Sequence, residues 1–246
     1  MKVFVEQPRP GVSLTGYLLD DSEEMPNAKP RPAVLIFPGG GYYACSDREA
    51  EPVAMAYLAQ GFQAFVLRYT TGQGEVFEAA LEDAQAALER LVESASDWSI
   101  DVERIAVVGF SAGGHLAASL GTMGRRRPAA LILGYPCILA SIGEQLGKKI
   151  PDLDTLVDQA TPRSFIFLTA NDGLVPAANG LAWAAALDRA GVPFELHVWP
   201  DGAHGLSLAQ PVTSAGNAQL VSARVAQWLE LSVAFLKEGW GDFPSS

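Results

Sequence analysis

A serine is flanked by glycines in the sequence Gly-Phe-Ser-Ala-Gly at residues 109–113. An apolar run at residues 105–108 precedes it, and a run typical of a helix follows at residues 115–123. A strand, a sharp Gly-x-Ser-x-Gly turn and a helix hold a nucleophilic serine on a strained turn. The flanking residues must be glycine because the strand and the helix leave no space for a Cβ atom. We therefore predict that Ser111 is a nucleophile in acyl transfer.

Acyl transfer by serine needs a base within hydrogen-bond reach, and the chain contains three histidines. His115 is on the helix that begins after the serine, so its side chain should point away from the hydroxyl. His197 is inside an apolar run that predicts a strand. His204 is in a glycine-rich loop just beyond that strand, and ligands of open α/β sheets bind outside the carboxyl ends of the strands. We predict that His204 is the base and that the other two histidines are structural.

The acid that orients the base should lie between Ser111 and His204 in the chain. Asp172 follows the predicted strand at residues 165–169 directly, and it gives the order Ser, Asp, His that is typical of α/β hydrolases. An Asp-Gly pair also favours an ordinary turn. Asp201, three residues before His204, is the weaker alternative. We predict Asp172 as the acid.

Three successive glycines follow another predicted strand, in the sequence Pro-Gly-Gly-Gly-Tyr at residues 38–42. Such a run lets the backbone approach a ligand and direct its N–H groups inward. The N–H groups of Gly40, Gly41 and Ala112 are predicted to form an oxyanion hole. The alternative is a tight loop without a catalytic role. Tyr42, Tyr43 and Trp183 could stack on a sugar ring, although aromatic residues at such positions are more often core.

Apolar runs that predict strands alternate with helical patterns along the chain. The first two runs predict an N-terminal hairpin, and most of the other six are apolar on both faces, as in buried parallel strands. Three amphipathic stripes predict helices between and after them, one from Leu81 to Val92, one from Leu181 to Leu187 and the last from Val221 to Phe235. This alternation predicts an α/β fold with a mostly parallel central sheet and helices on both faces. The predicted strands are residues 3–5, 14–19, 33–37, 64–67, 105–108, 129–133, 165–169 and 195–199.

The length of 246 residues fits one domain over residues 1–246. Residues 141–161 form the one long segment between predicted strands with little periodicity, which predicts a small cap over the site. The net charge of −11 argues against nucleic acid or anionic membranes as partners. Cys45 and Cys137 are expected to be free thiols.

The first residues carry no long apolar stretch, so no signal peptide is expected. No run in the sequence approaches about 18 consecutive apolar residues, so no membrane span is expected. A cytoplasmic location is therefore expected. No cofactor is expected. The histidines leave no convincing metal cluster.

The chain resembles bacterial esterases of the α/β-hydrolase superfamily, of the small acetyl-xylan and feruloyl esterase type, with hormone-sensitive-lipase-like esterases as wider relatives. The resemblance runs from about residue 33 to residue 236. It implies the α/β-hydrolase fold and the triad Ser111, Asp172 and His204. Three departures are visible: Pro38 stands where lipase-type relatives have histidine, Asn171 where a second aspartate is common, and Arg163 where a second proline is common. The motifs that carry the resemblance are residues 38–42, 46–49, 66–69, 109–116, 171–176 and 202–205.

The sequence therefore predicts a serine carboxylesterase whose substrate is a small ester, notably an acetyl ester on a xylo-oligosaccharide or a similar carbohydrate. A deacetylase, formamidase or peptidase acting on other small molecules is the alternative within enzymes. A non-catalytic receptor on a hydrolase scaffold is disfavoured because all three triad residues are present. The acyl group, the alcohol and the oligomeric state do not follow from the sequence.

Overall fold

The apolar runs of the sequence form the strands of one sheet in the computed structural model, which describes residues 1–243. The strands are β1 (Lys2–Arg9), β2 (Val12–Leu18), β3 (Arg31–Phe37), β4 (Gln63–Arg68), β5 (Ile100–Phe110), β6 (Ala130–Gly134), β7 (Arg163–Thr169) and β8 (Phe194–Trp199). All eight predicted strands are present, and the predicted fold class is confirmed.

The sheet has the order β1-β2-β4-β3-β5-β6-β7-β8. β1 and β2 form the predicted hairpin, and β2 pairs antiparallel with β4. The pairs from β4 through β8 are all parallel. Parallel neighbours need crossover connections, and helices supply most of them. The carboxyl ends of these strands therefore meet at one edge of the sheet, where the predicted site residues follow them.

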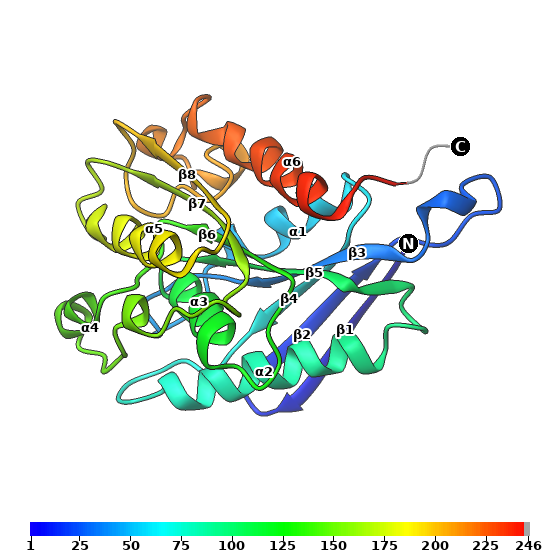
Figure 1. Cartoon of the computed structure of the whole chain (residues 1–246), viewed down its shortest axis with the longest axis horizontal. Helices are drawn as coiled ribbons and strands as arrows, with labels where there is room; N and C mark the ends of the chain where they lie inside the picture. Colours follow the sequence, from blue (N-terminus) through cyan, green and yellow to red (C-terminus); the bar gives the residue numbers. More distant parts are fainter. Residues whose placement is uncertain (244–246) are drawn as a thin grey trace.

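Helices cover both faces of the sheet, with α1 and α6 on one face and α2, α3 and α5 on the other (Figure 1). The α-helices are α1 (Glu51–Leu58), α2 (Phe77–Glu93), α3 (Ala112–Met123), α4 (Ala140–Leu146), α5 (Ala178–Ala190) and α6 (Trp228–Trp240). Short 3-10 helices span Pro26–Ala28, Asp47–Glu49, Leu153–Thr155, Pro211–Thr213, Ala218–Leu220 and Val225–Gln227. Among the described residues, no helix is both long enough and apolar enough to cross a membrane.

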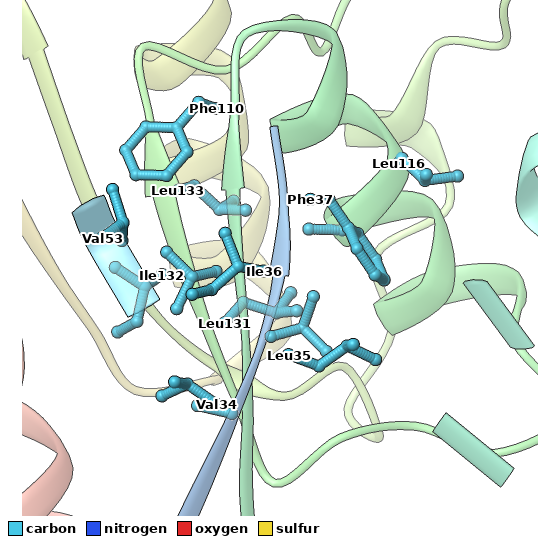
Figure 2. Close-up of a cluster of buried hydrophobic side chains, with 14 of the residues drawn as sticks. Val34, Leu35, Ile36, Phe37, Val53, Phe110, Leu116, Leu131, Ile132 and Leu133 are labelled. Carbon is cyan, nitrogen blue, oxygen red and sulfur yellow. The ribbon is translucent and has the colours of Figure 1, made fainter. Parts of the chain in front are cut away.

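Buried apolar side chains gather where the central strands meet the helices, as Figure 2 shows. β3 is buried along its whole length because helices cover both of its faces. Val53 reaches the cluster from α1, Leu116 from α3 and Phe110 from the end of β5, and each has no exposed surface. Truncating a side chain of this kind to alanine typically costs about 2–5 kcal/mol. The serine that follows Phe110 is thus carried at the end of a fully buried strand segment.

Two details of the predicted helices are wrong. The last helix begins at Trp228, and Val221 lies before it in extended backbone, where it is exposed. Short 3-10 turns interrupt this segment, and the Asn217 side chain accepts the Gln219 N–H at 3.0 Å. Leu181 is on the exposed face of α5, so it does not join the packed stripe. In both cases an exposed apolar residue lies close in the sequence to the buried residues of a helix, and the apolar pattern did not distinguish it from them.

Candidate active site

Ser111 connects the end of β5 to the start of α3 with the backbone angles φ 53° and ψ −118°. A positive φ is uncommon for a residue with a side chain, and it marks a strained turn. Added Cβ atoms show why the turn contains glycine. One on Gly109 would lie 2.3 Å from the Gly113 carbonyl oxygen, and one on Gly113 would lie 2.1 Å from the Phe37 oxygen. The predicted reason for both glycines is therefore correct.

His204 joins Ser111 to Asp172 although the three residues are far apart in the chain. Its Nε2 atom is 2.8 Å from Ser111 Oγ, and its Nδ1 atom is 2.7 Å from Asp172 Oδ2. A carboxylate only accepts hydrogen bonds, so Nδ1–H donates to Asp172. That tautomer leaves Nε2 free to accept the serine proton. The structure thus brings the three predicted residues into one hydrogen-bonded chain.

The Asp172 carboxylate is held by further donors in its own turn. Its side chain is 1% exposed. Its Oδ1 atom accepts the N–H groups of Leu174 at 2.8 Å and Val175 at 3.0 Å. Burial raises the pKa of this carboxyl, but the hydrogen bond from His204 and the two N–H groups outweigh it, so the pKa of Asp172 lies below its usual value. Asp172 is therefore ionised and oriented at neutral pH.

Side chains from other loops hold the loop that carries His204. Asn171 accepts the Gly202 N–H at 2.9 Å and donates to Asp201 Oδ1 at 3.2 Å. The weaker acid candidate, Asp201, therefore orients a neighbouring amide, and no hydrogen bond links it to His204. Arg48 donates to the Gly205 carbonyl and, at 2.6 Å, to the Thr213 carbonyl. These contacts fix the backbone on both sides of the histidine.

The glycine loop after β3 is pressed against the serine turn. A Cβ on Gly39 would lie 3.0 Å from the Ser111 Cβ, and one on Gly40 would lie 2.1 Å from the Ala44 oxygen. Gly40 and Gly41 have φ values of 134° and 63°, which glycine adopts without strain. Within residues 1–243, the N–H groups of Gly40 and Gly41 donate to no protein acceptor.

Ala112 is the first residue of α3, where a helix offers no acceptor for its N–H. The three predicted oxyanion donors are thus backbone N–H groups next to the serine turn, with no other protein partner among the described residues.

Glu49 is a site residue that the sequence analysis missed. Its buried carboxylate accepts the Gly39 N–H at 2.8 Å and the Tyr135 hydroxyl at 2.6 Å. The Tyr135 oxygen in turn accepts the Ser207 N–H at 2.8 Å, and the Tyr135 ring lies 5.1 Å from the His204 ring. Burial raises the pKa of Tyr135 well above its usual value, so the phenol stays protonated. This network links the glycine loop to the histidine loop.

The prediction that Tyr42 binds substrate is wrong for this geometry. Tyr42 is 2% exposed, and its hydroxyl lies 2.9 Å from His115 Nδ1, beneath the glycine loop. Trp183 is also fully buried, and its indole N–H donates to Ser164 Oγ at 3.3 Å. The two rings pack inside the protein because their polar atoms find partners there.

Tyr43 is the aromatic residue that lines the pocket over the serine. The pocket has a volume of about 390 Å³, and Leu146 from α4 and Leu174 lie on its wall. The hydroxyl of Tyr43 donates to the Leu146 carbonyl at 2.9 Å. Residues 141–161 therefore reach the edge of the site, while their role as a cap stays a prediction.

The remaining histidines and cysteines have structural surroundings. His197 stacks on Trp199 at the edge strand β8, and its Nε2 atom lies 2.5 Å from Glu195 Oε1. Both cysteines are free, and burial raises the pKa of Cys137 to about 12 and that of Cys45 to about 11. Over residues 1–243, no group of three or more His, Cys, Asp or Glu side chains could hold a metal ion.

Comparisons with known proteins agree with this geometry. The family described as BD-FAE matches residues 21–131, and the prolyl oligopeptidase family matches residues 146–234. An alpha/beta hydrolase enzyme from a Medee basin deep-sea metagenome library is 44% identical, with a TM-score of 0.90 and coverage of 96% of this chain and 98% of that one. An acetyl ester-xyloside bifunctional hydrolase from Caldicellulosiruptor lactoaceticus is 34% identical, with a TM-score of 0.80 and coverage of 92% and 88%.

One curated relative is an acetylxylan esterase from Xylanibacter ruminicola, which is 30% identical over 196 residues. These residues make up 70% of this chain and 40% of that protein. The chain spans 33% and 40% of the lengths of the first two curated relatives that it matches. The similarity to these two relatives therefore covers a part of each.

Proposed function

Because this chain belongs to the serine esterases of the α/β-hydrolase family, we propose that it hydrolyses short-chain acyl esters, acetyl esters above all, through Ser111, His204 and Asp172. The observation that carries this proposal is the hydrogen-bonded chain from Ser111 Oγ through His204 to the Asp172 carboxylate, with distances of 2.8 and 2.7 Å. Each step of the reaction needs one of these contacts.

In the first half of the reaction, His204 Nε2 takes the proton of Ser111 as Oγ attacks the ester carbonyl. Asp172 stabilises the imidazolium that forms. The tetrahedral intermediate then collapses, the bond to the alcohol oxygen breaks, and the alcohol leaves with the proton that His204 carried. An acyl-serine remains.

In the second half, His204 takes a proton from water, and the resulting hydroxide attacks the acyl-serine. The proton returns to Ser111 Oγ as the carboxylic acid departs. In both halves the N–H groups of Gly40, Gly41 and Ala112 bind the negative oxygen. Donors of this kind are effective because they are in place before charge develops, and losing one typically costs about 100- to 1000-fold in kcat. The contact between Glu49 and the Gly39 N–H supports this assignment because it orients the glycine loop.

The proposed substrate is an acetyl ester of a xylo-oligosaccharide or a similar small carbohydrate. Three observations support it: the acetylxylan esterase relative, the acetyl ester-xyloside hydrolase neighbour and the resemblance of residues 38–42 to the carbohydrate-esterase branch. The pocket of about 390 Å³ lies between Tyr43, Leu146 and Leu174. The Tyr43 ring narrows the acyl side of this pocket, which suits a short acyl group such as acetyl.

A panel of substrates tests the proposal. Wild-type protein and Ser111→Ala are assayed on p-nitrophenyl esters from acetyl to octanoyl and on acetylated xylo-oligosaccharides. Acetyl and propionyl esters should have the highest kcat/KM, and acetate should be released from the oligosaccharides. The Ser111→Ala variant should lose several powers of ten in kcat because the triad acts as a unit. A preference for octanoyl esters, or near-normal turnover by the variant, would refute the proposal.

A second candidate is the hydrolysis of amides in small peptides. The match of residues 146–234 to the prolyl oligopeptidase family favours it, because this segment contains both Asp172 and His204. Aminoacyl p-nitroanilides, assayed beside the matching aminoacyl p-nitrophenyl esters, distinguish the two functions. Turnover of the anilides at a rate comparable to the esters would favour the peptidase.

A further inference from the structure

The segment that follows β6 forms one wall of the active-site pocket through a single short helix. Leu146, the last residue of α4, lines the pocket together with Tyr43 and Ser111. α4 ends there because Gly147 adopts φ 66°, the left-handed conformation that stops helices. The hydroxyl of Tyr43 donates to the Leu146 carbonyl at 2.9 Å. The glycine loop and α4 therefore touch across the pocket.

Lys148 stabilises the contact between Tyr43 and Leu146. Its side chain is buried, and Nζ lies 3.9 Å from the centroid of the Tyr43 ring. Nζ also donates to the Gly72 carbonyl and, at 3.0 Å, to the Gly74 carbonyl. Among residues 1–243, no carboxylate pairs with this ammonium group. A buried cation is costly unless it is bound, so two carbonyls and a ring face replace the carboxylate.

A second connection joins the same loop to the end of the segment. The Tyr42 hydroxyl lies 2.9 Å from His115 Nδ1, and His115 Nε2 lies 3.3 Å from the Pro151 carbonyl oxygen. A carbonyl only accepts, so Nε2–H donates to Pro151 and Nδ1 accepts the tyrosine proton. Two consecutive tyrosines of the glycine loop thus hold residues 146–151 at both ends.

We propose that Lys148 is a specificity-determining residue that holds Tyr43 and Leu146 together as a fixed wall, and that this wall limits the length of the acyl chain. The inference rests on the proposed short-chain esterase function. Lys148 does not line the pocket, so it acts on the substrate only through Tyr43 and α4. When the ammonium group of Lys148 is removed, the Tyr43 ring loses the cation that packs on one of its faces. The chain that follows α4 also loses its hydrogen bonds to residues 72–74.

The size of the effect follows from the burial of methylene groups. Each methylene that gains a buried position improves binding about fourfold. An opening that admits two more methylenes therefore raises kcat/KM for hexanoyl or octanoyl esters about 15-fold relative to the acetyl ester. The acetyl ester itself is too short to reach such an opening, so its kcat/KM should stay within about twofold of the wild-type value.

The test compares Lys148→Met with Lys149→Met. Lys149 is the adjacent lysine, but its side chain is exposed, so this variant removes the same charge without touching the wall. Each protein is assayed on the p-nitrophenyl ester series, and amide hydrogen exchange is measured over residues 140–151. Tyr43→Phe is a second variant, which breaks the hydrogen bond to Leu146 and keeps the ring. Like Lys148→Met, the Tyr43→Phe variant should raise the ratio of octanoyl to acetyl kcat/KM.

We expect faster exchange over residues 140–151 and a higher octanoyl-to-acetyl ratio in Lys148→Met, with neither change in Lys149→Met. An unchanged ratio with acetyl activity intact would overturn the inference, and so would an equal loss on all esters. Unchanged exchange in Lys148→Met would overturn it as well. A wild-type protein without esterase activity would instead refute the proposed function, and the acyl selectivity assigned to the wall would fall with it.

Discussion

Acidification should destabilise this protein through His115, which is buried far from solvent on α3. The imidazole has no exposed surface, and its burial lowers the pKa of His115 from 6.5 to about 4, although the hydrogen bond to Pro151 opposes the shift. Between these two values the unfolded chain binds a proton at this residue and the folded protein does not. Stability therefore falls as the pH drops from about 6.5 to about 4 and changes little through this group outside that window.

The magnitude follows from the distance between the two pKa values. They differ by about 2.5 pH units, and each unit corresponds to about 1.4 kcal/mol. The complete loss in free energy of unfolding is thus about 3 kcal/mol, of which about 2 kcal/mol is lost by pH 5. The lowered pKa of Asp172 adds to the loss only below the ordinary range of a carboxyl group, so it does not disturb this window.

Urea denaturation at pH 7 and pH 5 measures the effect in the wild type, in His115→Gln and in His197→Gln. Glutamine does not titrate, so the His115→Gln variant should lose about 2 kcal/mol less than the wild type over this interval, whatever its stability at pH 7. The His197→Gln variant is the control: it keeps His115, so it should keep the steep dependence. Equal slopes in the wild type and His115→Gln would show that His115 is not held neutral by burial.

Further substitutions and one additive test the proposed chemistry. His204→Ala should abolish turnover while His197→Ala leaves most of it, and the reverse ranking in a kcat/KM assay would contradict the assignment of the base. Glu49→Gln should lower kcat about tenfold with little change in KM, because it weakens the support of the glycine loop without removing a direct oxyanion donor; an unchanged kcat would rule out that role. Gly40→Ala should lower kcat/KM strongly because its φ of 134° and the nearby carbonyl exclude a Cβ, and wild-type kinetics would refute the argument. EDTA should leave kcat/KM unchanged since no step of the proposed mechanism uses a metal, and inhibition restored by added metal would point to another mechanism.

Sequence patterns that span only a few residues determined the local structure. The alternation of apolar runs and stripes located all eight strands of the sheet, because burial of apolar side chains has a different period in strands and helices. The two glycines around Ser111 indicated the turn for the reason that the structure shows, since their Cβ atoms would meet backbone atoms. The order of Ser111, Asp172 and His204 sufficed to name the hydrogen-bonded chain.

Long-range packing decided the features that the sequence could not indicate. Glu49 belongs to a motif that indicated only a family resemblance, and nothing near it in the chain shows that its carboxylate meets Tyr135, 86 residues away at a strand end. Tyr42 and Tyr43 are adjacent and identical in type, but the backbone places one ring in the core and the other on the pocket wall.

The contact between Lys148 and Tyr43 likewise depends on where α4 ends beside the glycine loop. Local propensity controls the conformation of a segment. The partners of its buried polar atoms depend on distances across the folded chain, and these exist only once the sheet and its helices have packed.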